Sequence, residues 1–171
     1  MKPKNMSAAR YAALMGLLFA LAGALNTLEN LLSAFLPAGM RVGLSNIVIM
    51  AAILCVNLPS AAMLVILKAM LVLFTRGLTA SIMSLCGSMA AFLVTALLFR
   101  RTGCSYILTS VLGAIAHSVG QLCAAAVILG TVYTFAYAPV LGFASVGTGI
   151  FTGIVLKVTL PHVQRVISYE K

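Results

Sequence analysis

Six polar side chains stand in or next to apolar segments of this sequence, which has few other groups suited to chemistry. Lysine and arginine bind anions, and asparagine, glutamine and histidine orient ligands through hydrogen bonds. Polar groups in a hydrocarbon environment are costly when unsatisfied, so they tend to face the interior of a helix bundle and mark a pocket or a pathway. The six candidate substrate-binding residues are Glu29, Arg41, Asn46, Lys68, His117 and Gln121.

Positive charges outnumber negative ones among these membrane positions. Arg41, Lys68 and Arg76 share a single carboxylate, that of Glu29. Glu29 can neutralise one cation, and the others prefer an anionic ligand, lipid headgroups or water reached by snorkelling. We therefore predict an anion-accepting pocket in which Arg41 and Lys68 bind the negative part of a ligand and Glu29 holds Arg41 or Arg76. Arg76 lies at a loop, where contact with solvent or headgroups is the simpler expectation.

Gly113, His117 and Gln121 follow one another at four-residue spacing, which places them on one face of a helix. Such a face can hold a ligand, with the glycine leaving room for it, or it can make hydrogen bonds to a neighbouring helix. No carboxylate and no second histidine stands within a turn of His117, so a metal site is not expected. The cysteines lack C-x-x-C spacing and are expected to be small buried hydrophobic residues: Cys55, Cys86, Cys104 and Cys123.

The sequence is poorly equipped for catalysis. It has no pair of acids, no G-x-S-x-G or H-E-x-x-H pattern, no Asp-rich magnesium motif and no P-loop. An intramembrane enzyme using His117 lacks a second catalytic group. A role in binding or transport, without a cofactor, is therefore predicted.

The elements that position these residues are predicted to be transmembrane helices. Of the 171 residues, 63% are hydrophobic and 8% are charged, whereas soluble domains carry about 25% charged residues. The mean hydropathy is +1.16. We predict an all-α, six-helix membrane bundle forming a single domain over residues 1–171, with a break between the second and third spans at Asn57-Leu58-Pro59. The six spans are 9–31, 44–57, 60–75, 78–99, 105–130 and 137–160.

Most basic residues lie where an even number of spans places them on one side of the membrane. They are Lys2, Lys4, Arg10, Arg100, Arg101, Lys157, Arg165 and Lys171. Because basic loops remain in the cytoplasm, both termini are expected there. The net charge of +9 therefore sets orientation and attracts lipids, and no nucleic-acid partner is expected.

Small residues recur at four-residue spacing on the first and last spans. This spacing allows two helices to approach closely, either inside the bundle or at a docking surface for another membrane subunit. The residues are Ala8 with Ala12, Ala9 with Ala13, Gly16, Ala20 with Ala24, and Gly149 with Gly153.

Several motifs occur in an order that resembles the Gx transporter family, also described as heptaprenyl diphosphate synthase component I. This family is similar to the substrate-binding S components of energy-coupling factor (ECF) transporters, and the resemblance covers roughly residues 10 to 160. Arg41 stands where the family usually has lysine, and Ser118 where it usually has asparagine. The motifs are E-x₇-P (Glu29, Pro37), G-x-[KR]-x-G-L-[AS]-N-I (39–47), the basic Lys68, S-L-x-G (84–87) and G-A-x-x-H-x-x-G-Q (113–121).

The resemblance implies a six-helix S component in a bacterial plasma membrane. Such a subunit captures a small molecule on the outer side and docks on a coupling transmembrane subunit that carries two cytoplasmic ATPases. The ligand implied is a vitamin, quinone or isoprenoid precursor, or a flavin-like compound. In S components, small residues of the first helix face the coupling subunit, and Ala8, Ala9, Ala12 and Ala13 occupy matching places. The alternative is an accessory or scaffold subunit of a polyprenyl, quinone or electron-transfer pathway that transports nothing.

Overall fold

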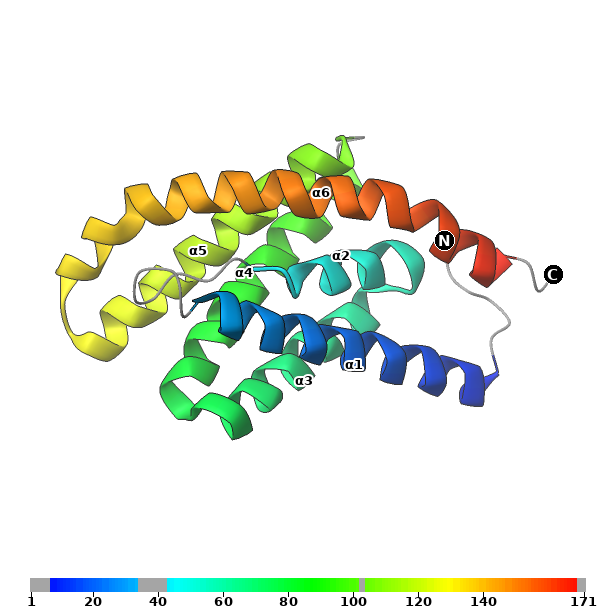
Figure 1. Ribbon diagram of the computed structural model, residues 1–171, viewed down its shortest axis with the longest axis horizontal. Coiled ribbons are helices and arrows are strands. Elements are labelled where there is room, and N and C mark those ends of the chain that lie inside the picture. Colours follow the sequence, from blue (N-terminus) through cyan, green and yellow to red (C-terminus); the bar gives the residue numbers. More distant parts are fainter. Residues whose placement is uncertain (1–6, 34–42, 102–103, 169–171) are drawn as a thin grey trace.

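All regular secondary structure in the described residues of the computed structural model (7–33, 43–101 and 104–168) is helical. This confirms the all-α prediction. Six α-helices and one 3₁₀ helix follow one another along the chain (Figure 1). They are α1 (Ala8–Ser33), α2 (Asn46–Cys55), α3 (Leu58–Arg76), α4 (Leu78–Arg101), α5 (Tyr106–Leu129), η1 (Val132–Tyr137) and α6 (Ala138–Ser168).

Five of these helices are long and apolar enough to cross a membrane, namely α1, α3, α4, α5 and α6. The protein is therefore a multi-pass membrane protein. The remaining helix, α2, has 10 residues and is about 15 Å long at roughly 1.5 Å per residue, half of the roughly 30 Å hydrocarbon core. The predicted span 44–57 is thus a short helix that cannot cross the bilayer by itself, and six helical crossings are not confirmed.

The break between α2 and α3 lies where the sequence predicted it. Asn57 has an extended backbone and caps α3, because its side-chain oxygen accepts hydrogen bonds from the Ser60 amide (2.8 Å) and the Ser60 hydroxyl (2.6 Å). Pro59 occupies the first turn of α3, where its missing N–H costs nothing. The Ser60 hydroxyl also contacts the Tyr11 hydroxyl of α1 at 2.7 Å, which joins α1 to the start of α3.

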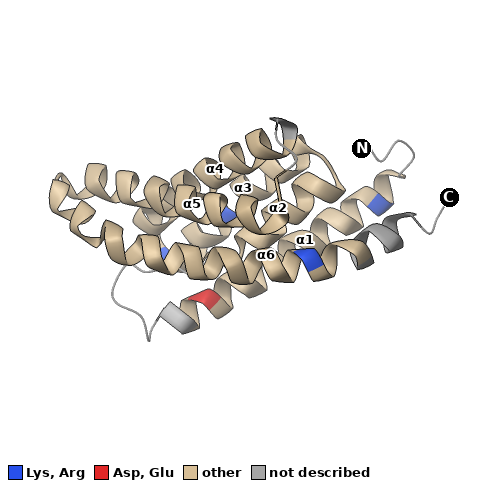
Figure 2. Cartoon of the chain, turned by 90° about the horizontal axis from the view of Figure 1, so that it is seen from above, with Lys and Arg blue, Asp and Glu red and all other residues tan. Residues whose placement is uncertain are grey.

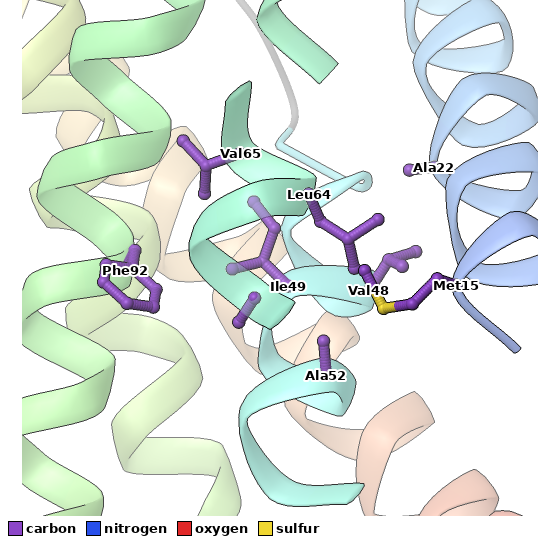
Figure 3. Close-up of a cluster of buried hydrophobic side chains, with 9 residues drawn as sticks. Met15, Ala22, Val48, Ile49, Ala52, Leu64, Val65 and Phe92 are labelled. Carbon is purple, nitrogen blue, oxygen red and sulfur yellow. The ribbon is translucent and has the colours of Figure 1, made fainter. Parts of the chain in front are cut away.

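The short helix α2 lies inside the bundle and supplies much of its core. Val48, Ile49 and Ala52 of α2 are almost fully buried. Figure 3 shows them surrounded by side chains of α1, α3 and α4, including Met15, Ala22, Leu64, Val65 and Phe92. Met50 of α2 also packs against Leu156 and Leu160 of α6. Four helices, α1, α3, α4 and α6, therefore surround α2.

Glycine contacts join α5 to α6 at close range. A Cβ atom added to Gly149 of α6 would lie 2.5 Å from the Val111 Cα, and one added to Gly153 would lie 2.7 Å from the Ile107 Cα. These distances are shorter than any real Cβ contact, so only glycine fits. The predicted close packing at Gly149 and Gly153 is confirmed as a contact inside the bundle.

The first helix is the least buried of the long helices. Only a narrow line of side chains, among them Met15, Ala22, Asn26 and Glu29, is buried against α2 and α3. Four alanines near its start are exposed, so the alternative that they pack inside the bundle is wrong. They are Ala8, Ala9, Ala12 and Ala13.

The prediction that the cysteines are buried is also wrong. Cys86 and Cys123 are exposed, and Cys55 and Cys104 are partly buried. Hydrophobic character does not distinguish the core of a membrane protein from its lipid-facing surface, because both are apolar.

The first turn of α1 and the last turn of α6 lie at the same end of the molecule (Figure 1). Figure 2, a view from above, shows lysine, arginine and glutamate scattered sparsely along the described parts of the helices. That both ends of the chain face the cytoplasm stays a prediction from the basic residues.

Candidate ligand-binding site

A cluster of polar groups, most of them buried, surrounds the N-terminal end of α2. It draws on α1, α3, α4 and α5 and on the turn that leads into α2. We call it the polar cluster, and it consists of Glu29, Gly43, Ser45, Asn46, Lys68, Ser88, His117 and Gln121.

The Glu29 carboxylate holds the turn before α2. It is 3% exposed. One of its oxygens accepts a hydrogen bond from the Gly43 amide at 2.6 Å, and the other accepts one from the Ser45 hydroxyl at 3.4 Å. A negative charge at this place also interacts favourably with the N-terminal end of the helix dipole. The anion at the start of α2 is therefore supplied by the protein itself.

Lys68 brings a positive charge into the bundle from the middle of α3. Its side chain is 3% exposed. Its ammonium group donates to the Asn46 Oδ1 at 3.3 Å and to the Ser88 Oγ at 3.1 Å. These neutral acceptors replace part of the hydration that the ammonium loses on burial. The contacts tie α3 to α2 and α4.

His117 and Gln121 form a pair on one face of α5, as their spacing predicted. The Gln121 Nε2 and the His117 Nε2 are 3.0 Å apart. Gly87 of α4 makes room for them, since a Cβ atom there would lie 2.7 Å from the Gln121 Cγ and 2.9 Å from the His117 ring. The hydrogen bond runs along α5 itself, so it does not link two helices.

Gly43 connects the histidine to the rest of the polar cluster. Its φ of +72° lies in the left-handed region that favours glycine. A Cβ atom at this position would lie 3.3 Å from the Asn46 Nδ2 and 4.0 Å from the His117 Cδ2. The turn before α2 therefore brings Glu29, Asn46 and His117 to one place.

A small cavity adjoins the polar cluster between α2, α4, α5 and α6. Its volume is about 20 Å³, counted as the space open to the centre of a water molecule. That is room for about one water. Its polar lining comes from Asn46, Thr95, Ser110, Thr148 and Thr152, and its remaining lining from Gly43, Ile47, Ile49, Met50, Ala91, Gly113 and Ala114.

The structure brings together five of the six predicted binding residues: Glu29, Asn46, Lys68, His117 and Gln121. The sixth, Arg41, lies outside the described residues. Arg76 is exposed at the end of α3, as expected for a residue at a loop.

Sequence reasoning missed Ser88 and the four hydroxyl residues that line the cavity. Serine and threonine are common in membrane helices and often bond to their own backbone, so their type alone carries no signal. Ser88 stands one turn after Ser84 of the S-L-x-G motif. That four-residue spacing was the available hint for Ser88.

A model of one protein family, described as heptaprenyl diphosphate synthase component I, matches residues 18–159. The matched range contains every residue of the polar cluster and every residue that lines the cavity. Neither the curated proteins nor the solved structures gave a match.

Proposed function

Because the chain belongs to the heptaprenyl diphosphate synthase component I family, we propose that it is the substrate-binding S component of an ECF-type transporter. In this role it captures a small anionic or amphipathic molecule, such as a vitamin, quinone or isoprenoid precursor, from outside a bacterial cell. It passes the molecule on with the help of a coupling transmembrane subunit and cytoplasmic ATPases. Both of its termini face the cytoplasm, and its role is binding rather than catalysis.

The observation that carries this proposal is the polar cluster itself. A carboxylate, an ammonium, an imidazole and a carboxamide are each 3% exposed, and the other buried polar side chains among the described residues are serine, threonine and Asn26. The four are Glu29, Lys68, His117 and Gln121. Burying ionisable groups in a membrane is costly, so such groups mark a functional site by default. Glu29 lies in the half of α1 farthest from its start, so the polar cluster lies toward the outer side under the proposed orientation.

Lys68 and Arg41 are assigned to the anionic part of the ligand. Lys68 is the buried cation of the polar cluster. Arg41 stands two residues before Gly43, the residue whose amide binds Glu29. Asn46, His117 and Gln121 supply the hydrogen bonds that orient the ligand.

Replacing Lys68 by methionine tests the anion assignment. We expect Lys68→Met to weaken binding of geranyl diphosphate or riboflavin 5′-phosphate by about tenfold or more, because a buried cation facing an anion is lost. Equilibrium dialysis of detergent-purified protein measures this. Lys157→Met is the matched control, since Lys157 is an exposed lysine of α6. Equal binding by wild type and Lys68→Met contradicts the assignment of Lys68 to the anionic part of the ligand.

Docking to the coupling subunit is assigned to the exposed start of α1. Leucine at both Ala9 and Ala13 is expected to abolish co-purification of the coupling subunit and ATPases while leaving the isolated subunit folded, because close helix contact needs small residues. Pull-down from the native membrane measures it. Ala136→Leu, at an exposed alanine of η1, is the control. Unchanged recovery of the coupling subunit contradicts this docking surface.

The family's description favours a second candidate, in which the protein is an accessory membrane subunit of a prenyl diphosphate synthase and carries no transported ligand. The same pull-down separates the two candidates. Recovery of the coupling subunit and ATPases supports transport, whereas recovery of a prenyltransferase alone supports the accessory role.

A further inference from the structure

Asn46 separates the charged side of the polar cluster from the cavity. The Lys68 ammonium lies 3.3 Å from the Asn46 Oδ1. Because an ammonium only donates hydrogen bonds, the carboxamide oxygen must be the atom that faces Lys68. The carboxamide nitrogen is thereby turned the other way, next to Gly43, and both residues belong to the cavity lining.

This nitrogen is a buried donor that lacks an acceptor. The Asn46 Nδ2 has less than 1 Å² of accessible surface and no hydrogen-bond partner among the described residues. A buried amide N–H without an acceptor is costly, so native structures usually supply one from the protein, a water or a ligand. An acceptor from outside the described residues is therefore expected beside Asn46.

Three of the four hydroxyl groups around the cavity are already committed as donors. The hydroxyls of Thr148 and Thr152 donate to the carbonyl oxygens of Ser145 and Gly149. The Ser110 hydroxyl lies 2.5 Å from that of Thr152 and therefore donates to it. These contacts leave the Asn46 carboxamide and the Thr95 hydroxyl as the donors for an occupant.

The described residues that line the cavity include no ionisable side chain. A charged group placed there would lose its hydration without gaining a counter-ion. An uncharged oxygen, such as that of a carbonyl or a hydroxyl, fits both the lining and the volume of about 20 Å³.

We propose that the uncharged, oxygen-bearing end of the substrate enters this cavity and accepts a hydrogen bond from the Asn46 Nδ2. This inference rests on the proposed function as a ligand-binding subunit. It assigns Asn46, Ala114 and the cavity hydroxyls to the neutral end of an amphipathic molecule, while Lys68 belongs to the charged end. The oxygen takes the place of one water molecule.

The test compares two uncharged two-ring compounds, menadione and 2-methylnaphthalene. They share a carbon skeleton, and only menadione has carbonyl oxygens. We expect wild-type protein in detergent to bind menadione about tenfold more tightly than 2-methylnaphthalene in equilibrium dialysis. A single hydrogen bond to an otherwise unsatisfied buried donor contributes about that much to affinity.

Two variants locate the effect in the cavity. Asn46→Asp keeps an oxygen for Lys68 and removes the N–H donors, so the preference for menadione is expected to disappear. Ala114→Val fills the cavity while the Asn46 side chain is kept, and is expected to weaken menadione binding to a similar extent. Ser118→Ala is the control, because Ser118 forms a buried hydroxyl pair with Ser145 at 2.6 Å outside the cavity lining.

Several outcomes overturn the inference. They are equal binding of the two compounds by wild type, binding of neither, or an unchanged preference in Asn46→Asp and Ala114→Val. If geranyl diphosphate binds and menadione does not, the S-component proposal stands and the cavity assignment fails. If none of the three compounds binds and no coupling subunit co-purifies, both proposals fail.

Discussion

Gly149→Leu is expected to destabilise the protein by about 3 kcal/mol, because overpacking of a close helix contact costs about 1–3 kcal/mol and sometimes more. The Cβ atom of any other residue at this position would lie 2.5 Å from the Val111 Cα, which is a backbone atom and cannot rotate away. The helices α5 and α6 must therefore separate. The free energy of unfolding in mixed detergent, followed by circular dichroism, measures the loss.

Gly147→Leu is the matched control for this substitution. Gly147 lies two residues away on the same helix, is exposed, and has no heavy atom within 4 Å of an added Cβ. Both variants gain the same side chain and the same helix propensity. Comparable stability of the two variants contradicts the close α5–α6 contact.

The second large effect is expected at Glu29. Glu29→Ala is predicted to lower the free energy of unfolding by about 3 kcal/mol. It leaves the Gly43 amide and the Ser45 hydroxyl as buried donors without acceptors, and each such donor destabilises a protein by about 1–3 kcal/mol. Glu29→Gln keeps one acceptor oxygen and loses the charge, so it is predicted to lower the free energy of unfolding by about 1 kcal/mol. Thermal unfolding of the purified proteins measures the order of stability of wild type, Glu29→Gln and Glu29→Ala.

Thr27→Ala tests whether the loss of stability is specific to Glu29 or follows from any substitution in α1. Thr27 is exposed on α1 and its hydroxyl donates to the Gly23 carbonyl of its own helix. We expect it to change stability by less than about 0.5 kcal/mol, as is usual for surface positions. A loss in Thr27→Ala equal to that in Glu29→Ala, or equal losses in the Ala and Gln variants of Glu29, speaks against a carboxylate that supports the start of α2.

Much of the fold was predictable because apolar length and turn chemistry are local properties. The break at Asn57-Leu58-Pro59 follows from one proline and one capping asparagine. The length of α2 was not predictable, because the apolar run around it does not show where a helix begins. Its start is set by Gly43 and Glu29, and Glu29 lies on another helix.

The candidate site was predictable where a polar residue is rare in its surroundings. Glu29, Lys68 and His117 stand out in an apolar sequence and are all buried in the polar cluster. Thr95 and Ser110 were not predictable as cavity residues. Their place depends on how α4 and α5 are rotated about their axes, and packing sets that rotation.

The shallow burial of α1 has a consequence for communication between the two ends of the bundle. Its exposed alanines lie near its start, and Glu29 lies sixteen residues beyond Ala13, about 24 Å along a helix that rises about 1.5 Å per residue. A partner that shifts or rotates α1 from its first turns also moves the Glu29 carboxylate relative to the turn before α2. Because coupling between two sites is reciprocal, an occupant of the polar cluster changes the affinity for that partner by the same factor.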